Sequence, residues 1–558
     1  MKFLELKLFD DFRSLKSGFK LRFQDESPRF DDGITTFDDG ASFDSNVFNA
    51  YCVVGHNGSG KSNILELLSS IFYQLEINNL KFLPQISYED DENELAFKEH
   101  EAFVNYDVSP NAYELSYEIK GHSIKIVKEL TEVPILYLLE NDEWVRQSAV
   151  DMKEYLPEYI IGYSSGENEI LSLPFLKMRM IQYDEYLDYV SKDISYPSAE
   201  SRMVYLDDIY SQAIFVTNFL DVDNRLQQEG MLDIFRETLG ISAIREFRMI
   251  INTQKDTPVY KDYEGSYQKE YTKLSVGVEK KIEILKSCST LYYEDTEHDK
   301  LYLDFYLDDA CREAFRRHFD SGRELFEFFQ LLITLNYYHI DEKIKEKLYR
   351  SRSLYAQGFL PQVTWDEKFF TFKDFWIEKE GVDKPILSRS LSDGEYQFMH
   401  TIGIGLLYRG TSSLFLLDEP ETHFNPSWRA KYISTLRKCF EGDDVSPEVL
   451  ITSHSPFIVS DSTPENVLVF EKDEKGVVEC TRPNFNTFGA SVNKITMGIF
   501  EKRETIGEYA GQIIDEFKAR METTDDLEAL FSELDETLGD SIEKTLFMKE
   551  LFDRIEKK

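Results

Sequence analysis

A phosphate-binding motif constrains this chain more than any other feature of its sequence. Residues 55–62 read Gly-His-Asn-Gly-Ser-Gly-Lys-Ser, which fits the pattern G-x-x-x-x-G-K-S. The apolar segment Ala50–Val54 precedes the motif, and the amphipathic segment Asn63–Leu75 follows it. This order predicts a buried strand, a loop that wraps phosphate and a helix. The sequence therefore predicts an α/β core built around a mixed sheet.

The residues of this motif have distinct expected roles toward a bound ATP. Backbone N–H groups of the glycine-rich loop can surround phosphate oxygens, and the helix N-terminus adds the positive end of its dipole. Lys61 is expected to bridge the β- and γ-phosphates, and Ser62 is expected to ligate Mg²⁺. The other residues expected to contact the nucleotide are Gly55, Asn57, Gly58, Ser59, Gly60 and Asn63.

Two apolar segments far along the chain end in residues suited to hydrolysis. Leu414–Leu417 reads as a buried strand and is followed by Asp418 and Glu419. A carboxylate at this end of a strand can reach the metal, which is the role expected for Asp418, and Glu419 is expected to polarise the attacking water as general base. A second apolar segment precedes His454, which is expected to contact the γ-phosphate. The expected catalytic residues are thus Glu419, His454 and Lys61, with Ser62 and Asp418 as metal ligands.

A second anion site is predicted at Ser392-Asp393-Gly394, where a helix begins. Ser392 and Glu395 have the spacing of a capping box, so this segment has a purely structural interpretation as a stable helix start. The phosphate loop already fills one anion-binding role in the chain. We therefore favour the interpretation that these three residues close over ATP bound by a second copy, which predicts an ATP-driven homodimer or higher homo-oligomer.

Composition limits the partners of the chain. With 558 residues, the chain exceeds one hydrophobic core, and 42% hydrophobic residues with 14% aromatics indicate packed lobes. The formal net charge of −40 repels nucleic acid on average. DNA contact would therefore need a local basic surface, for which Arg245–Lys255 and Lys343–Arg352 are the candidates.

The cysteines and apolar segments indicate a cytoplasmic protein. Five scattered cysteines form no C-x-x-C pair, which fits a reducing compartment and predicts no zinc site or disulfide framework. The N-terminal segment carries charges within its apolar stretch, unlike a signal peptide. Because no apolar run is long enough to cross a bilayer, we expect no membrane association.

The changing periodicity along the chain predicts five regions. Alternating apolar residues indicate strands near the N-terminus and between about 100 and 150, and helical periods begin at about 196. The expected regions are 1–100, the N-terminal lobe with the phosphate loop; 101–195, an antiparallel β-rich part; 196–355, a large helical insertion; 356–483, the C-terminal lobe with the other nucleotide motifs; and 484–558, a helical C-terminal region.

The four motifs, in this order, resemble the ABC-type ATPase head of the SMC, RecF and OLD-like clan. The hairpin expected around Phe12–Lys16 is also similar to the opening of such heads. A narrower similarity involves Tyr163–Ser172, Phe488–Asn493 and Lys502–Thr505, which look like segments of restriction-system-associated ATPases and of PtuA-type ATPases from Septu and retron systems. That resemblance implies antiphage defence, with a separate PtuB-like HNH nuclease and in some systems a reverse transcriptase with its DNA.

The chain departs from these families in several ways. A glutamine that links nucleotide to the inserted lobe is not assignable, and Gln74, Gln85 and the 163–172 segment remain candidates. Asp393 stands where many relatives have glycine, which puts a carboxylate near the partner's phosphates and could slow turnover. No Asp-x-Asp pair follows Asp461 and no HNH cluster is seen, so the chain is not expected to cut DNA.

Three functions remain open at this stage. The first is an ATPase whose head pairing controls a separate nuclease, and the second is a RecF-like DNA-repair ATPase that binds DNA directly. The third is an assembly scaffold that holds ATP without turnover. The last apolar helix, Ser541–Phe552, either packs on the chain's own core or docks a partner.

Overall fold

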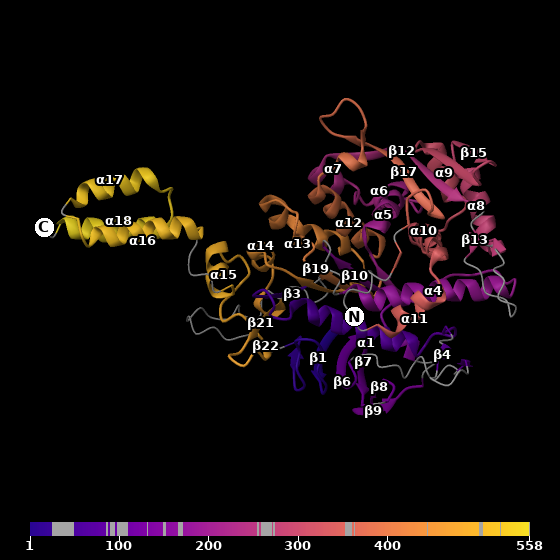
Figure 1. Cartoon of the computed structure of the whole chain (residues 1–558), viewed down its shortest axis with the longest axis horizontal. Coiled ribbons are helices and arrows are strands. Elements are labelled where there is room, and N and C mark those ends of the chain that lie inside the picture. The colour runs from indigo at the N-terminus through magenta and orange to yellow at the C-terminus, as the bar shows by residue number, and fades with distance from the viewer. Residues whose placement is uncertain are drawn as a thin grey trace.

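The computed structural model describes residues 1–24, 50–84, 87–89, 95–97, 110–130, 132–148, 152–165, 171–253, 256–257, 270–271, 274–351, 360–361, 363–443, 445–500, 506–524 and 526–556. Within this part of the chain, helices pack against three sheets of five or more strands (Figure 1). The prediction of a mixed α/β fold is confirmed.

A seven-stranded sheet lies at the centre of the molecule (Figure 1). Its first six strands are parallel, and the last is antiparallel to its neighbour. Parallel strands of this kind need connections that cover both faces of the sheet. In spatial order the strands are β11 (Met203–Tyr205), β10 (Ile160–Ser164), β19 (Leu414–Asp418), β20 (Glu448–Thr452), β3 (Ala50–Gly55), β21 (Val467–Lys472) and β22 (Val478–Thr481).

The central strands are buried on both faces, because their side chains enter two different cores. Along β3, Tyr51 and Val53 belong to one core, whereas Cys52 and Val54 belong to the other. Every residue of β3, β19 and β20 is buried. This explains why these segments read as short continuous apolar runs rather than as alternating ones.

One face of the central sheet is covered by α1 (Lys61–Ile77), α4 (Ser172–Ser191) and a six-stranded antiparallel sheet. In β6 the buried and less buried residues alternate, as the sequence predicted for this region. The sheet also takes in the N-terminal strands, so it joins residues 2–22 to residues 113–146. Its order is β2 (Lys20–Arg22), β1 (Lys2–Leu8), β6 (Tyr113–Ile119), β7 (His122–Lys128), β8 (Ile135–Glu140) and β9 (Glu143–Arg146).

The other face carries helices and a five-stranded antiparallel sheet. The helices that enter this core include α5 (Asp208–Leu220), α10 (Gly322–Thr334), α12 (Asp393–Leu407) and α13 (Pro426–Phe440). The sheet order is β15 (Leu291–Asp295), β16 (Lys300–Tyr306), β12 (Ile241–Asn252), β17 (Phe370–Lys379) and β18 (Ile386–Leu387).

Residues 196–355, expected as a large helical insertion, also contribute strands to this sheet. The segment contains β11, β12, β15 and β16 besides its helices. Phe247, Met249 and Ile251 alternate along β12 and are buried, a period-two pattern that the surrounding helical segments obscured. Because β17 pairs with β12, a division between residues 355 and 356 would cut through one sheet.

The remaining elements are short. They are β4 (Ser87–Glu89), β5 (Leu95–Phe97), η1 (Lys153–Tyr155), α6 (Arg225–Gln228), α7 (Asp233–Leu239), β13 (Asp256–Thr257), β14 (Glu270–Tyr271), α8 (Val276–Cys288), α9 (Asp309–Arg316), η2 (Leu335–His339), α11 (Glu342–Arg350), η4 (Ser388–Ser390), α14 (Pro456–Ser460), η5 (Pro464–Asn466) and α15 (Val492–Gly498). In the part of the chain that is described, no helix combines the length and the apolar character that crossing a bilayer requires.

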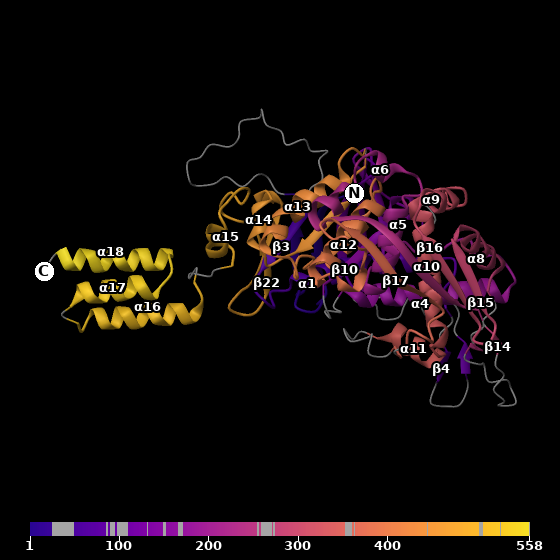
Figure 2. The ribbon, with the colours of Figure 1, turned by 90° about the horizontal axis from the view of Figure 1, so that it is seen from above.

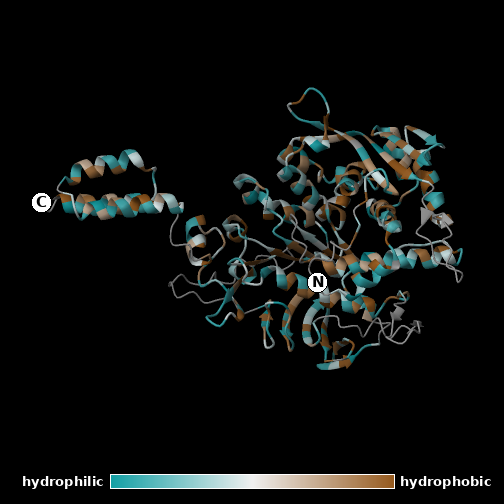
Figure 3. Cartoon of the chain, in the orientation of Figure 1, coloured by the Kyte–Doolittle hydropathy of each residue, from teal (hydrophilic) through white to brown (hydrophobic). Residues whose placement is uncertain are grey.

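Three C-terminal helices form a separate small unit at one end of the molecule (Figures 1 and 2). They are α16 (Glu508–Met521), α17 (Leu527–Thr537) and α18 (Ile542–Glu556), and they share a hydrophobic core of their own. Polar and apolar residues alternate along each of them (Figure 3). Phe517, Leu527 and Leu530 are buried in this core, and Ile513 and Phe531 pack against it as partly buried residues.

Helix α18 packs through only part of its apolar residues. Phe547 and Leu551 are buried in the core of the three-helix unit. Ile542, Leu546 and Phe552 are instead 51%, 64% and 51% exposed. The helix therefore packs on its own unit through one face and leaves apolar side chains on another.

Candidate nucleotide site

The predicted site residues meet where parallel strands of the central sheet end. Strand β3 leads into the phosphate loop, β19 ends at Asp418, and β20 leads into Thr452 and His454. Strand β10, beside β19, ends at Ser164. Because the carboxyl ends of parallel strands lie at one edge of a sheet, residues hundreds of positions apart come together there.

The phosphate loop has the backbone that its glycines permit. Gly60 is the N-cap of α1 with a φ of 98°, in the left-handed region that disfavours side chains. At Gly55 the φ is 145°, and a Cβ there would lie 2.1 Å from the carbonyl oxygen of Phe470. Glycine at both positions is thus required by backbone conformation and by the close approach of a neighbouring strand.

Lys61 is held over this loop. Its Nζ donates to the carbonyl oxygens of Gly55 at 3.2 Å and His56 at 3.0 Å, and the residue is only 5% exposed. Burial lowers the pKa of Lys61, while Glu419 and Asp418 act in the opposite direction. A buried cation that rests on carbonyl oxygens is positioned to exchange them for phosphate oxygens.

Asp418 is the centre of a hydrogen-bond network. Ser62 Oγ donates to its Oδ1 at 2.8 Å, Thr452 Oγ1 donates to the same oxygen at 2.6 Å, and Ser164 Oγ donates to Oδ2 at 3.3 Å. The predicted metal pair Ser62 and Asp418 is therefore in direct contact. Hydroxyl and carboxylate oxygens fit Mg²⁺, which binds through one or two carboxylates together with phosphates and water.

The described residues contain no group of three or more His, Cys, Asp or Glu side chains arranged to hold a metal by themselves. This agrees with the chemistry of Ser62 and Asp418, which supply too few protein ligands for a closed metal cage. A cation at this place would need oxygens from a bound nucleotide to complete its coordination.

Glu419 and His454 face each other beyond Asp418. His454 Nε2 lies 3.4 Å from Glu419 Oε1, and both side chains are partly exposed. Glu419 has a φ of 47°, and its N–H donates to Thr452 Oγ1 at 3.0 Å. A left-handed backbone at a non-glycine residue is uncommon and is found at functional sites, where neighbouring contacts hold it.

The protonation of this pair suits a water-activating site. Burial raises the pKa of Glu419, and the nearby Asp418 adds to that shift. Burial lowers the pKa of His454 to about 4, with further contributions from Lys61 and His56. The imidazole is therefore neutral at neutral pH, so it can donate one hydrogen bond and accept another.

The predicted hairpin near the N-terminus packs on the start of α1. Phe12 and Leu15 form its bridge, and Ser14 Oγ donates to Asn63 Oδ1 at 2.6 Å. Arg13 pairs with Glu66 at 2.8 Å. These contacts fix the helix that carries Lys61 and Ser62, and they place Asn63 toward the hairpin.

A cavity of about 530 Å³ lies beside the phosphate loop. Two of its residues come from the region of α15, Thr496 and Phe500. The Phe500 ring lies 6.3 Å from the His454 ring. Neither residue was expected from the sequence, and Thr452 had no predicted role, although its position at a strand end was a usable signal. The cavity is lined by Gly55, His56, Asn57, His454, Pro456, Thr496 and Phe500.

The second predicted anion site lies at the surface and does not line this cavity. Ser392 caps α12, and its side chain and Glu395 form both hydrogen bonds of a capping box. Ser392 and Asp393 are exposed, whereas Gly394 is buried with the His423 carbonyl oxygen 2.6 Å from where a Cβ would be. The helix-start interpretation is thus correct, and the same geometry leaves Ser392 and Asp393 facing outward.

The candidates for a glutamine that links the nucleotide to the inserted lobe differ in where they lie. Gln74 is buried on α1, donates to the Pro110 carbonyl oxygen at 3.0 Å and accepts from Tyr113, so it faces the antiparallel sheet. Gln85 lies outside the described residues. Ser165, at the start of the 163–172 segment, donates its N–H to the Asp418 carbonyl oxygen at 3.1 Å. Of the described candidates, this segment approaches the site.

The basic segments proposed for DNA contact are only partly at the surface. Arg245 is exposed on β12. In the other segment Lys345 is 3% exposed and pairs with Asp184 at 2.5 Å. Lys255 and Arg352 lie outside the described residues.

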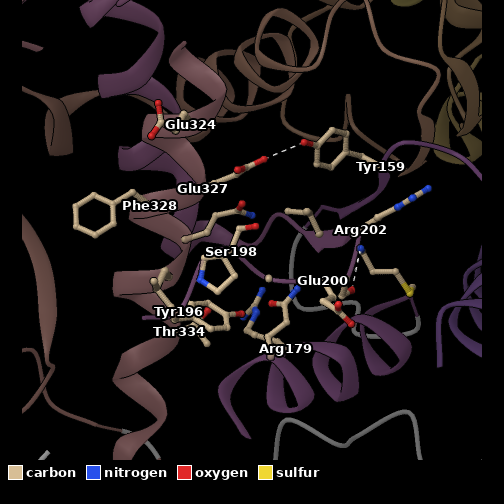
Figure 4. A pocket seen from close by; sticks show the side chains of 18 of the residues that line it. Tyr159, Arg179, Tyr196, Ser198, Glu200, Arg202, Glu324, Glu327, Phe328 and Thr334 are labelled. Carbon is tan, nitrogen blue, oxygen red and sulfur yellow. Dashed lines mark hydrogen bonds between the residues drawn. The ribbon is translucent and has the colours of Figure 1, made fainter. Parts of the chain in front are cut away.

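A larger cavity, of about 680 Å³, lies beyond the edge strand β11 (Figure 4). Arg179 on its floor donates to Asp207 at 3.0 Å, and Tyr159 donates to Glu327 at 2.8 Å. Lys281 lies 3.5 Å from Glu324. These charged groups of the cavity thus have partners within the chain.

Comparison with known proteins bears on part of the chain. Residues 220–460 match the family described as "AAA domain, putative AbiEii toxin, Type IV TA system". The matched segment includes Ser392, Asp418, Glu419 and His454 but not the phosphate loop, and it spans less than half of the chain. Together with the site geometry, the match supports an ATPase domain of the AAA type.

One curated protein is related over a shorter stretch. Protein ea59 of Escherichia phage lambda is 27% identical over 140 residues, which is 25% of this chain and 25% of ea59. The matched stretch thus represents about a quarter of the length of that relative.

Two solved structures align over most of the chain at low similarity. The SMC head domain from Thermotoga maritima has 10% identity and a TM-score of 0.30, with coverage of 86% of this chain and 99% of that chain. The structure titled SmcHead bound to the C-winged helix domain of ScpA has 12% identity and a TM-score of 0.31, with coverage of 86% and 96%. Neither likeness enters the functional argument.

Proposed function

We propose that this chain binds and hydrolyses ATP with Mg²⁺. The observation that carries the proposal is the contact between Ser62 of the phosphate loop and Asp418 of β19, with Thr452 and Glu419 joined to the same network. This hydrogen bond joins two residues that are 356 positions apart in the sequence. A purely structural network would not need a lysine over a glycine-rich loop beside it.

Each residue then has a defined task. Lys61 exchanges its carbonyl partners for phosphate oxygens, and Ser62 with Asp418 holds the metal side of the triphosphate. Mg²⁺, when bound, neutralises charge on the β- and γ-phosphates. Glu419 accepts a proton from the attacking water, for which its raised pKa is favourable, and neutral His454 holds that water or the γ-phosphate.

We further propose that ATP pairs two copies of the chain. Ser392 and Asp393 are exposed at the N-terminus of α12, where the helix dipole favours an anion. In the paired state, Ser392 of one copy closes over the triphosphate held by Lys61 of the other. Hydrolysis releases the γ-phosphate that both copies contact, and the two copies then separate.

We also propose that this pairing controls a separate nuclease in antiphage defence, with a reverse transcriptase and its DNA as a further partner. The support is the resemblance of residues 163–172 and 488–493 to defence-associated ATPases. The family that residues 220–460 match is described as a putative toxin of a toxin–antitoxin system. Co-purification of this chain with the product of a neighbouring nuclease gene tests this part, and a lone ATPase in a replication gene cluster would contradict it.

Phosphate release and size measurements test the ATPase proposal. The wild type should release phosphate from Mg²⁺-ATP, and Lys61→Ala should not. Glu419→Gln should bind ATP without releasing phosphate and should accumulate as a dimer. Equal phosphate release by wild type and Lys61→Ala would refute catalysis at this site.

Direct DNA binding is a second candidate function, favoured by one surface. Strands β12 and β16 of the five-stranded antiparallel sheet carry two cation–ring contacts. Arg245 lies 5.8 Å from the Tyr306 ring, and Arg248 lies 5.6 Å from the Tyr302 ring. Tyr293, stacked on Tyr302, is 61% exposed. Cations interleaved with aromatic rings are used by proteins that bind single strands. A steep loss of DNA affinity with salt would support this function.

A further inference from the structure

Glu421 is a buried carboxyl group two residues beyond Glu419. It is 4% exposed, and its Oε1 accepts a short hydrogen bond from Ser453 Oγ. Its Oε2 has no hydrogen-bond partner among the described residues. Burying a carboxyl group costs free energy unless its interactions offset the loss of water, so its presence beside the site calls for an explanation.

Ser453 connects this carboxyl group to the segment that carries His454. Its Oγ accepts from the N–H of Ser455 at 2.9 Å, and its own N–H donates to the Val53 carbonyl oxygen at 3.0 Å. Ser453 is fully buried. The residues on both sides of His454 are therefore tied together through one hydroxyl group, which Glu421 holds in place.

The backbone around Glu421 has separate support. Its carbonyl oxygen accepts from Phe424 N at 3.0 Å and from Arg429 Nε at 3.3 Å. Removing the side chain would leave these contacts in place. The side chain is therefore needed for the Ser453 contact rather than for the turn in which it sits.

We infer that Glu421 is a positioning residue: through Ser453 it fixes the backbone that aims His454 at Glu419 and at the γ-phosphate. This inference rests on the proposed ATP hydrolysis and names a residue that this hydrolysis needs. Glu421 follows Glu419 by two residues, and Glu419 is held in a left-handed backbone by Thr452. The general base and the histidine are thus fixed by two adjacent hydrogen bonds from one turn to one strand end.

Kinetics of matched variants test the inference. Glu421→Ala and Ser453→Ala should lower kcat for ATP by about 10–100-fold, the range found when groups that orient a catalytic ligand are removed. KM should change little, because the lysine and the loop that bind phosphate are untouched. Glu421→Gln keeps an acceptor for Ser453 Oγ and should restore most of kcat.

Glu448→Ala is the control for burial alone. Glu448 is 5% exposed, accepts from Phe3 N at 2.9 Å and stands at the start of β20, the end of the strand away from the site. Its replacement should lower thermal stability, as Glu421→Ala should, yet leave kcat near the wild-type value. A kcat loss equal in both alanine variants would overturn the positioning role.

A second readout does not depend on hydrolysis. In protein labelled with ¹³C-histidine, the His454 signal is assigned by its loss in His454→Asn. Its chemical shift and titration should change in Glu421→Ala and should match the wild type in Glu421→Gln. An unchanged His454 signal in Glu421→Ala refutes the inference even if the chain hydrolyses ATP. A changed signal in a chain that does not hydrolyse ATP supports the contact and refutes the proposed function instead.

Discussion

The two predicted anion sites of this chain differ sharply in how they are built. Around Asp418, residues at the ends of β10, β19 and β20 and at the start of α1 are hydrogen-bonded to one another, and Lys61 is 5% exposed. Around Ser392, the side chain bonds to its own helix, and its neighbour Asp393 is exposed. One region is assembled by the fold of a single chain, and the other is presented to the outside.

Under the proposed pairing, this difference would divide the work between two copies. A buried, pre-assembled network is suited to hold a triphosphate and a metal without reorganisation. An exposed helix N-terminus with a satisfied capping box is stable alone and still offers N–H groups to an anion. The division predicts that variants of the first region affect nucleotide binding and chemistry within one copy. Variants of the second should affect pairing.

The largest effect is expected at the general base. Glu419→Gln should lower kcat by about 10²–10⁴-fold, because the amide cannot accept the proton of the attacking water. ATP affinity should remain close to that of the wild type. Single-turnover phosphate release measures the loss, and a decrease below about tenfold would assign the base elsewhere.

A smaller effect is expected from backbone strain in the phosphate loop. Gly55→Ala places a Cβ 2.1 Å from the Phe470 carbonyl oxygen, at a φ of 145°. The clash and the backbone conformation should lower the free energy of unfolding by about 1–3 kcal/mol. Urea denaturation measures this change. Unaltered stability would mean that the phosphate loop is not tightly packed against Phe470 at position 55.

At the exposed anion site around Ser392, the substitution to test is Asp393→Asn. Because Asp393 is at the surface, the free energy of unfolding should change by less than about 0.5 kcal/mol. Turnover should increase, since a carboxylate facing the partner's phosphates is removed. Parallel denaturation and phosphate-release curves measure the two effects, and slower turnover would contradict the placement of Asp393 at a partner's nucleotide.

A further effect concerns pH and lies away from both sites. Burial raises the pKa of Glu185 from its ordinary 4.5 to about 7, and Tyr196 donates to it at 2.9 Å. Between these values the folded chain holds a proton that the unfolded chain has lost, so stability falls as pH rises from 4.5 to about 7. Glu185→Gln should remove about 2 kcal/mol of this pH dependence. Denaturation of the wild type and of Glu185→Gln at pH 5 and pH 8 measures this difference. If the free energy of unfolding changes equally with pH in both proteins, a buried, protonated Glu185 is excluded.

The parts of the site that could be predicted are those encoded locally. Gly55, Gly60 and Lys61 belong to one short motif, residues 55–62. Its glycines indicate the backbone conformation of the loop. Asp418 and His454 each follow a buried strand, so their meeting follows from the rule that parallel strands end at one edge. The capping box at Ser392 was likewise visible as a four-residue pattern.

The parts that could not be predicted depend on tertiary packing. Phe500 lies near His454 from the bend that follows α15, a segment with no motif of its own. Gln74 was a candidate by position alone, and its hydrogen bonds turn it toward the antiparallel sheet. The alternation in β12 could not be separated from neighbouring helical periods, because β17, the strand that pairs with it, lies more than 100 residues later.

Complementation between two inactive variants tests the shared-nucleotide account most directly. Lys61→Ala loses the phosphate grip, and Ser392→Glu places a negative charge where the partner's triphosphate should be. If each site combines Lys61 of one copy with Ser392 of the other, an equal mixture forms mixed dimers with one intact site. Phosphate release should then recover to about a quarter of the wild-type rate for random pairing. No recovery above the separate variants, under conditions where mixed dimers form, would contradict the account.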